Sequence, residues 1–371
     1  MAYKKNLRKG GIGGKLGHSN MSHWDFTEVK LQSRKLRRLE EQEIIETEIY
    51  ESPRFPNPKR KVTNKRRKIA QSYMNQQQVN ELIQILSQER MLFYYFKDYY
   101  AFLLLSYLID DGLSIQEIAQ TKFSRLLNKP TIKQAISYSG DGFLTREKLF
   151  SYLSPIQECY LLTLGDWGEE NDRWWSQTSR HGKNLVLQLN FSNKHNKPYH
   201  KLIKPNEDYH PFENECHPIA TENFHTLAWS RIDISDDYEY ALIEEIQNDW
   251  IREAISIRNE TEGDNTHLDI YIDDVLKPHL KIWDEAMLAS TIWLLKEEIG
   301  INKIYYHTHN SGNMLKNISE NYAPPKSIYT KLPEKFCFIE TENVPPFLQG
   351  KIDIYQEENK VPIKFYFLDF N

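Results

Sequence analysis

The stretch from residue 282 to residue 338 decides the fold of this chain. It reads IWDEAMLASTIWLLKEEIG (282–300), INKIYYHT (301–308) and, two residues later, SGNMLKNISENYAPPKSIYTKLPEKFCF (311–338). This pattern predicts a long buried helix, a short apolar strand, a second short helix, a proline-rich turn and another strand. Gly300 is well placed to end the long helix. Helices that alternate with strands predict half of an α/β domain.

A second apolar run, YALIEEIQNDW (240–250), precedes this stretch. It begins with four residues that are apolar on both faces, which predicts a central strand covered on both sides. Glu244 and Glu245 follow on opposite faces at its carboxyl end, where open α/β sheets bind ligands. Burial would raise the pKa of a carboxyl group there, so we expect one of them to be a general base. The alternative is that they cap the next helix or pair with Arg231 or Arg252.

Several polar and aromatic residues near this strand end are expected to bind a ligand. They are Gln247, Asp249, Trp250, His307, His309 and Lys316. The alternation in IYYHTH predicts that the two histidines share one strand face, and Lys316 is expected to be exposed on a short helix capped by Ser311. A metal ion would need ligands besides the two histidines of IYYHTH. The candidates are His210, Cys216, His217 and His225, and their spacing matches no standard zinc finger. We therefore expect no metal, and ordinary hydrogen bonding is the alternative role for these histidines.

Two tyrosines beside the proline-rich turn, Tyr322 and Tyr329, are candidate proton donors. Core packing is the alternative role for both. Cys337 lies between two phenylalanines, which predicts a buried, unreactive thiol on a strand.

The charge of the chain is unevenly distributed. Its net charge is −5, yet residues 1–70 hold 18 Lys and Arg against 8 Asp and Glu. A basic arm on an acidic body predicts a nucleic-acid or ribosome partner, and a solvated, disordered tail is the alternative. Two basic clusters in the arm could contact phosphates. They comprise Lys59, Arg60, Lys61, Lys65, Arg66, Arg67 and Lys68.

Composition divides the chain into three parts. Residues 1–75 are expected to form a basic, largely disordered arm with one polar helix, and residues 76–153 a helical domain. A candidate helix-turn-helix lies in that domain, and its second helix would carry Lys122 and Arg125. Short strand patterns from residue 154 to 371 predict an α/β (α+β) domain with a mixed sheet.

The three cysteines do not resemble a disulfide framework, which favours a reducing compartment. No apolar run approaches the ~20 residues needed to span a bilayer. The first residues, MAYKKNLRKGGIGGK, lack the apolar segment of a secretory signal. We therefore expect a cytoplasmic protein that does not contact a membrane.

The order of elements over roughly residues 225–340 resembles the C-terminal half of GNAT-type acyltransferases. An acidic strand, a long helix, a strand, a short helix, a proline-rich turn and a final strand carry the resemblance. It implies that Glu244 or Glu245 is the base and Tyr322 or Tyr329 the acid in acylating an amine from acyl-CoA. The segment EEIQNDW is also similar to a motif of large phage- and mobile-element-associated proteins.

One part of the chain departs from the GNAT pattern. Those enzymes bind the CoA pyrophosphate through a glycine-rich loop between the acidic strand and the long helix. Here that interval, residues 251–281, holds only Gly263 and several acids. Either CoA binds otherwise or the activity is lost. Two hypotheses follow: a GNAT-like transferase acting on a protein or RNA-linked amine, and a non-enzymatic nucleic-acid-associated binding protein. A mobile-element, defence or toxin context would fit both.

Overall fold

A computed structural model describes residues 74–86, 91–109, 112–151, 157–169, 176–205, 210–220, 224–261, 263, 265–319 and 323–371. The described residues from 74 to 86 and from 93 onward belong to one compact unit. The arm, its two basic clusters and Tyr322 lie outside the described residues.

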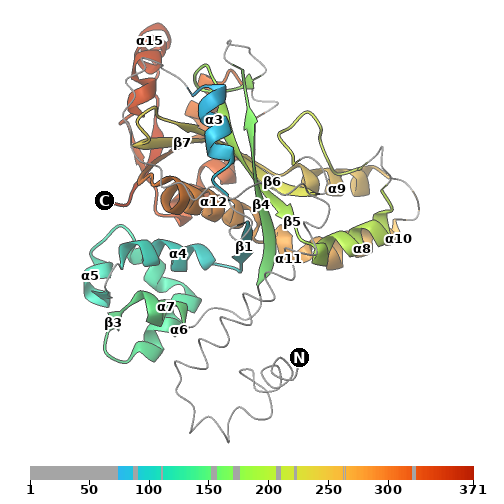
Figure 1. Ribbon diagram of the computed structural model, residues 1–371, viewed down its shortest axis with the longest axis horizontal. Coiled ribbons are helices and arrows are strands. Elements are labelled where there is room, and N and C mark those ends of the chain that lie inside the picture. The colour runs from blue at the N-terminus through green and yellow to red at the C-terminus, as the bar shows by residue number, and fades with distance from the viewer. Residues whose placement is uncertain are drawn as a thin grey trace, which may run out of the picture. The chain divides into compact units, whose positions relative to one another are not determined.

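The described residues form a mixed α/β structure around one eight-stranded sheet, with strand order β1-β4-β5-β6-β7-β8-β10-β9 (Figure 1). The strands are β1 (Leu92–Tyr95), β4 (Glu158–Trp167), β5 (Asn184–Phe191), β6 (Thr226–Ile234), β7 (Tyr240–Gln247), β8 (Lys303–His307), β9 (Ile339–Thr341) and β10 (Phe365–Asp369). Neighbours from β4 to β7 are antiparallel, β7 and β8 are parallel, and β10 is antiparallel to both β8 and β9. The mixed sheet predicted from the sequence is confirmed. A separate short ladder joins β2 (Leu113–Ser114) to β3 (Phe143–Leu144).

Helices connect and cover these strands. They are α3 (Gln76–Ile83), α4 (Tyr99–Leu108), α5 (Ile115–Ala119), η3 (Ser124–Asn128), α6 (Pro130–Ser139), α7 (Arg146–Phe150), α8 (Asn193–Ile203), α9 (Asp249–Glu260), α10 (Thr266–Ile270), η5 (Tyr271–Leu276), α11 (Lys277–Leu280), α12 (Trp283–Trp293), η6 (Leu294–Ile299), α13 (His309–Leu315), η8 (Lys326–Tyr329), α14 (Lys331–Lys335), η9 (Pro346–Leu348) and α15 (Gln349–Asn359). Figure 1 shows α8, α9 and α10 gathered together, away from α15. Within the part of the chain that the structure describes, no helix has both the length and the apolar composition to cross a membrane.

The β7–β8 pair is covered on both faces, as predicted for a central strand. Ile243 and Tyr306 point into the main core, to which α12 also contributes. Leu242 and Tyr305 alternate with them and belong to a second core that includes Leu315 of α13 and residues of α15. Each strand of the pair therefore contributes to both cores, which fixes its register.

The long helix expected after residue 282 is confirmed as α12, continued by η6. Gly300 ends it with a φ of 89°, a conformation that glycine adopts without steric cost. Near its start, the fully buried carboxylate of Glu285 pairs with Lys97 at 2.5 Å and with Lys335 at 3.0 Å. On the next turns, Thr291 shares a hydrogen bond with Ser230 of β6. These polar contacts hold α12 in place over the sheet.

The region from 76 to 153 differs from the expected helical domain. Residues 92–95, predicted as helix, form β1 of the main sheet. The predicted DNA-reading helix, which was to carry Lys122, Arg125, Lys129 and Lys133, is not continuous within residues 112–151. Its residues are divided among a turn, η3 and α6. Lys122 donates a hydrogen bond to a backbone carbonyl of β10, and Arg125 donates one to the end of α14. Both side chains therefore tie this region to the C-terminal part of the domain.

Two further segments differ from their predicted form. The histidine-rich segment 193–218, whose sequence is typical of a loop, contains helix α8, with Pro198 inside it. His195 and Tyr199, one turn apart, bury one face of α8 against the core, and this packing outweighs the cost of the proline. Cys337 lies in a turn with φ of 63° rather than on a strand, and β9 begins only after it. Its thiol is nevertheless buried, as predicted.

Candidate functional site

Several charged side chains lie in the core at the carboxyl end of the β7–β8 pair. The last registered pair is Ile243 with Tyr306, although β7 continues to Gln247. On the other side of β7, Arg231 of β6 pairs with Glu245 and the next pair includes Ile243, so Glu244 is the extra residue of a bulge. Bulges of this kind re-aim side chains and are common beside active sites.

Glu244 forms a closed network with His307 and a loop serine. Its two carboxylate oxygens accept hydrogen bonds from the backbone N–H of Ser179 at 2.9 Å and from the Ser179 hydroxyl at 2.8 Å. The Nε2 atom of His307 lies 3.0 Å from the carboxylate and 2.7 Å from the Ser179 hydroxyl. All three residues are fully buried. The hydroxyl and the carboxylate share one ring nitrogen, so the arrangement differs from a hydrolytic triad, in which they occupy opposite nitrogens.

The protonation of this network follows from its surroundings. Burial alone would raise the pKa of Glu244, but the hydrogen bond with His307 and the charges of Lys316 and Arg231 lower it to about 2. Burial lowers the pKa of His307, so its ring is neutral at pH 7. An ionised carboxylate only accepts hydrogen bonds, so the proton of the neutral ring belongs on Nε2. The expectation of a raised pKa for a base at Glu244 is therefore wrong.

Glu245 points to different partners, as strand alternation predicts. It forms an ion pair with Arg231, and Gln247 donates a hydrogen bond to its other oxygen. Both charged side chains are almost completely buried. Burial would raise the pKa of Glu245, but Arg231 and Lys316 lower it overall. The pairing with Arg231 anticipated from the sequence is present.

Lys316 is buried rather than exposed. Its ammonium group donates a hydrogen bond of 2.8 Å to the backbone carbonyl of Glu244. Burial lowers the pKa of Lys316, and the nearby charge of Glu245 opposes that effect. The network thus contains two carboxylates and two basic side chains around a neutral histidine, which keeps its net charge small.

Tyr329 comes from η8 and borders the same network. Burial raises the pKa of Tyr329 well above its ordinary value, and the charge of Glu245 adds to that effect. The structure therefore brings the candidate acid near one candidate base. Unpartnered polar atoms also gather here. Buried side-chain atoms without a hydrogen-bond partner among the described residues include Arg231 Nε, Gln247 Oε1, Asn248 Nδ2 and His307 Nδ1.

The helix that follows β7 begins with polar contacts of its own. Asn248 caps α9 by accepting the backbone N–H of Ile251. Asp249 in the first turn binds His217 at 2.7 Å and Arg252 at 2.6 Å. The protein's own carboxylate therefore occupies the turn where a helix N-terminus would otherwise attract an anion. Trp250, fully buried, points away from this network into an aromatic cluster.

His309 does not share a strand face with His307, because β8 ends at His307 and α13 begins at His309. The cap of α13 is Thr308, one turn before the predicted Ser311. The His309 ring contacts the backbone carbonyl of Pro324 at 3.1 Å. α13 packs directly over the network, since a Cβ atom added at Gly312 would lie 3.0 Å from the Cβ of His307.

The sequence patterns did not identify Ser179 or Arg180, in the loop between β4 and β5, as partners of the site. Ser179 of that loop binds Glu244, and Arg180 forms a two-pronged ion pair with Asp233 of β6 at 2.7 and 2.9 Å. The backbone carbonyl of Ser176 accepts a hydrogen bond from Arg231. Arginine and aspartate inside the otherwise apolar strand TLAWSRIDI were a usable signal, because such charges need buried partners. The sequence around Ser179 held no comparable signal.

Other features of the described residues lie away from this network. A cavity of about 480 Å³ is lined by residues of α8, α9 and α10 and by none of the predicted site residues. The group whose atoms could together hold a metal ion is His210, Glu213 and His225.

The chain matches no protein-family model, no curated protein and no solved structure.

Proposed function

We propose that this protein transfers an acyl group from acyl-CoA to an amine at the carboxyl end of β7. The observation that carries the proposal is the set of unpartnered polar atoms gathered there, where β7 continues beyond its last pair with β8. Buried polar groups normally have partners, so their concentration at one strand end favours a ligand site. The element order that resembles GNAT-type acyltransferases, with β7, α12, β8 and α13 in sequence, also supports the proposal.

The proposed chemistry needs one proton acceptor and one proton donor. The amine nitrogen attacks the thioester carbonyl carbon, the carbon–sulfur bond breaks, and a proton passes from the amine to the departing sulfur. Glu245, ionised at neutral pH because of its lowered pKa, accepts the amine proton. Tyr329, protonated because of its raised pKa, donates to the sulfur and is then reprotonated. Glu244 accepts hydrogen bonds from Ser179 of the β4–β5 loop and positions His307 and β7 instead.

Asp249 restricts where the pyrophosphate of acyl-CoA can bind. Its carboxylate lies in the first turn of α9 and would repel a pyrophosphate there. The proposal therefore places the thioester arm beside Tyr329 and the phosphates away from α9. Acetyl-pantetheine, which lacks the pyrophosphate, should then replace acetyl-CoA with little loss of affinity. A large loss would show that this part of the assignment is wrong.

Tyr329→Phe is the substitution that tests the function. It removes only one buried hydroxyl and keeps the ring, so the fold should persist. Loss of a general acid should lower acyl transfer to poly-lysine or to aminoacyl-RNA by about 100-fold or more. Tyr107→Phe is the matched control. It also removes a buried tyrosine hydroxyl, but outside the proposed site, and should retain activity. Equal activity of both variants would refute the role of Tyr329.

Glu245→Gln is a weaker test, because it leaves Arg231 buried opposite a neutral partner. Breaking such a pair costs about 3–5 kcal/mol, so lost activity could reflect unfolding. Its activity should be interpreted only beside a thermal unfolding curve.

We further propose that the basic arm guides a protein or RNA-linked acceptor to the site and that the protein is cytoplasmic. The net charge of +10 over residues 1–70 supports the first point, and the absence of disulfides among the described cysteines is compatible with the second. Deleting residues 1–70 should remove salt-sensitive RNA binding. Unchanged binding would refute this role and would leave the acyl-transfer proposal intact.

A further inference from the structure

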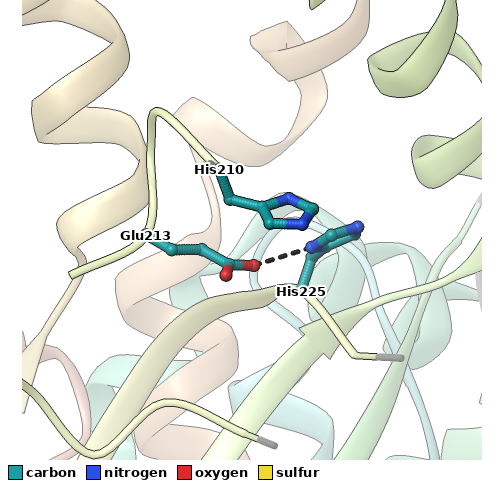
Figure 2. Close-up of side chains that lie close together, drawn as sticks. All are labelled: His210, Glu213 and His225. Atoms are coloured by element: carbon teal, nitrogen blue, oxygen red, sulfur yellow. Dashed lines mark hydrogen bonds and ion pairs between the residues drawn. The ribbon is translucent and has the colours of Figure 1, made fainter. Parts of the chain in front are cut away.

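A cluster of histidines lies at the end of β6 nearest α8, away from the network at β7. His225 immediately precedes β6, and His210 and Glu213 lie on the segment that follows α8. Figure 2 shows the three side chains converging, with the rings of His210 and His225 beside one another and the Glu213 carboxylate between their backbones. Each offers a ligand atom, and these atoms all lie within 4.8 Å of one another.

The contacts within the cluster leave coordinating atoms available. The Nδ1 atom of His225 lies 2.7 Å from a carboxylate oxygen of Glu213. Its Nε2 atom lies 3.2 Å from the Nε2 atom of His200 on α8. The Nδ1 atom of His210 is buried and has no hydrogen-bond partner among the described residues. Two imidazoles and one carboxylate therefore face one small volume.

We propose that His210, Glu213 and His225 bind a divalent transition-metal ion, with zinc the best-fitting candidate. Two imidazoles and one carboxylate are a donor set that zinc and iron(II) accept in proteins. In a tetrahedral zinc site, ligand atoms about 2.0–2.1 Å from the metal lie about 3.3 Å apart. The ligand atoms of the cluster need only small side-chain rotations to reach that spacing from within 4.8 Å.

The hydrogen bonds assign a role to each nitrogen of His225. Nδ1, which now faces Glu213, is the ligand atom, because the metal replaces the shared proton. Nε2 then keeps its hydrogen and donates it to His200. Metal-bound histidines usually donate their second N–H to an acceptor, which fixes the tautomer and orients the ring. His200 is thus a positioning residue, and the fourth coordination position remains for water or a substrate group.

The surroundings hold the histidine ligands in place and let an ion reach them. The ring of Trp250, the last residue of the EIQNDW segment, packs 5.3 Å from the His225 ring, and that of Tyr199 lies 5.2 Å from it. His210 and Glu213 are only partly buried, so an ion has a path from solvent. The spacing of the ligands along the chain matches no standard motif because α8 and β6 bring them together only in the fold.

The test is the metal content of the full-length protein purified without a histidine tag. After dialysis against a weak chelator, elemental mass spectrometry should find one zinc ion per chain, or one equivalent should bind in a calorimetric titration with zinc. Cobalt(II) loading should give visible absorption bands that disappear when zinc is added. These readouts do not depend on acyl transfer, so either proposal can fail without the other.

Three variants test which residues bind the metal ion. Glu213→Gln and His210→Ala remove ligands on a surface segment and should lower zinc affinity at least 10-fold with an unchanged circular dichroism spectrum. His267→Ala removes an exposed histidine of nearby α10 and should bind zinc as the parent does. Absence of zinc binding by the parent protein would overturn the proposal. Equal zinc affinity in the parent and both ligand variants would also overturn it.

Discussion

Replacing Glu244 with glutamine should destabilise the protein strongly at pH 7 and only weakly at pH 3. The pKa of Glu244 falls from an ordinary 4.5 to about 2 in the folded protein, because His307 and nearby cations outweigh burial. Each pKa unit corresponds to about 1.4 kcal/mol, so the ionised carboxylate contributes about 3 kcal/mol to the free energy of unfolding at neutral pH. Glutamine keeps the size of the side chain and loses this contribution.

The sign of the pH dependence follows from the lowered pKa. Below pH 4.5 the unfolded chain binds a proton at this position more readily than the folded protein does. The contribution of Glu244 is therefore complete above pH 4.5 and is lost as the pH falls towards 2. It should be about 1 kcal/mol at pH 3. The lowered pKa of His307 acts in the same direction, with stability falling as the pH drops below about 6.5.

Urea denaturation followed by tryptophan fluorescence at several pH values measures this difference. The gap in unfolding free energy between the parent and Glu244→Gln should narrow by about 2 kcal/mol between pH 7 and pH 3. Glu357→Gln, on the exposed face of α15, is the matched control and should show almost no gap at either pH. A gap for Glu244→Gln that stays constant with pH would refute the assignment of an ionised, network-bound carboxylate.

Three further substitutions or reactions test other parts of the structure. Gly312→Ala should lower the free energy of unfolding by about 1–3 kcal/mol in urea denaturation, because its Cβ would press on the His307 side chain. Gly350→Ala is the control, because its Cβ would meet nothing within 4 Å, and it should be neutral or stabilising by up to about 1 kcal/mol. A similar loss of unfolding free energy in the two variants would contradict the packing of α13 over His307. Cys216 is exposed and should react quickly with Ellman's reagent at pH 8, whereas Cys337 should not react in the folded protein, because burial raises its pKa to about 11. Asn248→Ala should cost about 1 kcal/mol through loss of the α9 cap, and an unchanged denaturation midpoint would show that this cap contributes nothing.

The regular parts of the sheet and its main helix could be predicted from the sequence. The apolar runs that became β5, β6 and β7 have the length and composition of buried strands, and Gly300 marks the end of the α12–η6 helix. Residues 92–95 were harder, because an aromatic run fits a helix or a strand equally well until its tertiary partners are known. α8 was missed because Pro198 is a strong local signal against a helix, and tertiary packing overrode it.

The site was predicted only in part, for a physical reason. Glu244 and Glu245 could be located because acids at the end of an apolar strand are a local signal. Their partners could not, because Ser179 lies 65 residues before Glu244 and 128 before His307. Contacts of that separation depend on how the β4–β5 loop folds back over the strands. Lys316 was expected in solvent and lies in the core for the same reason, because its partner is distant in the sequence.

Hydrogen–deuterium exchange with and without acetyl-CoA tests the central claim most directly. If the acyl donor binds at the carboxyl end of β7, backbone amides around Gln247 and around Tyr329 should exchange more slowly when acetyl-CoA is present. The protection should weaken in Tyr329→Phe and remain in Tyr107→Phe. Exchange that is unchanged in both segments at saturating acetyl-CoA, or protection confined to other parts of the chain, would contradict the proposed acyl-transfer site.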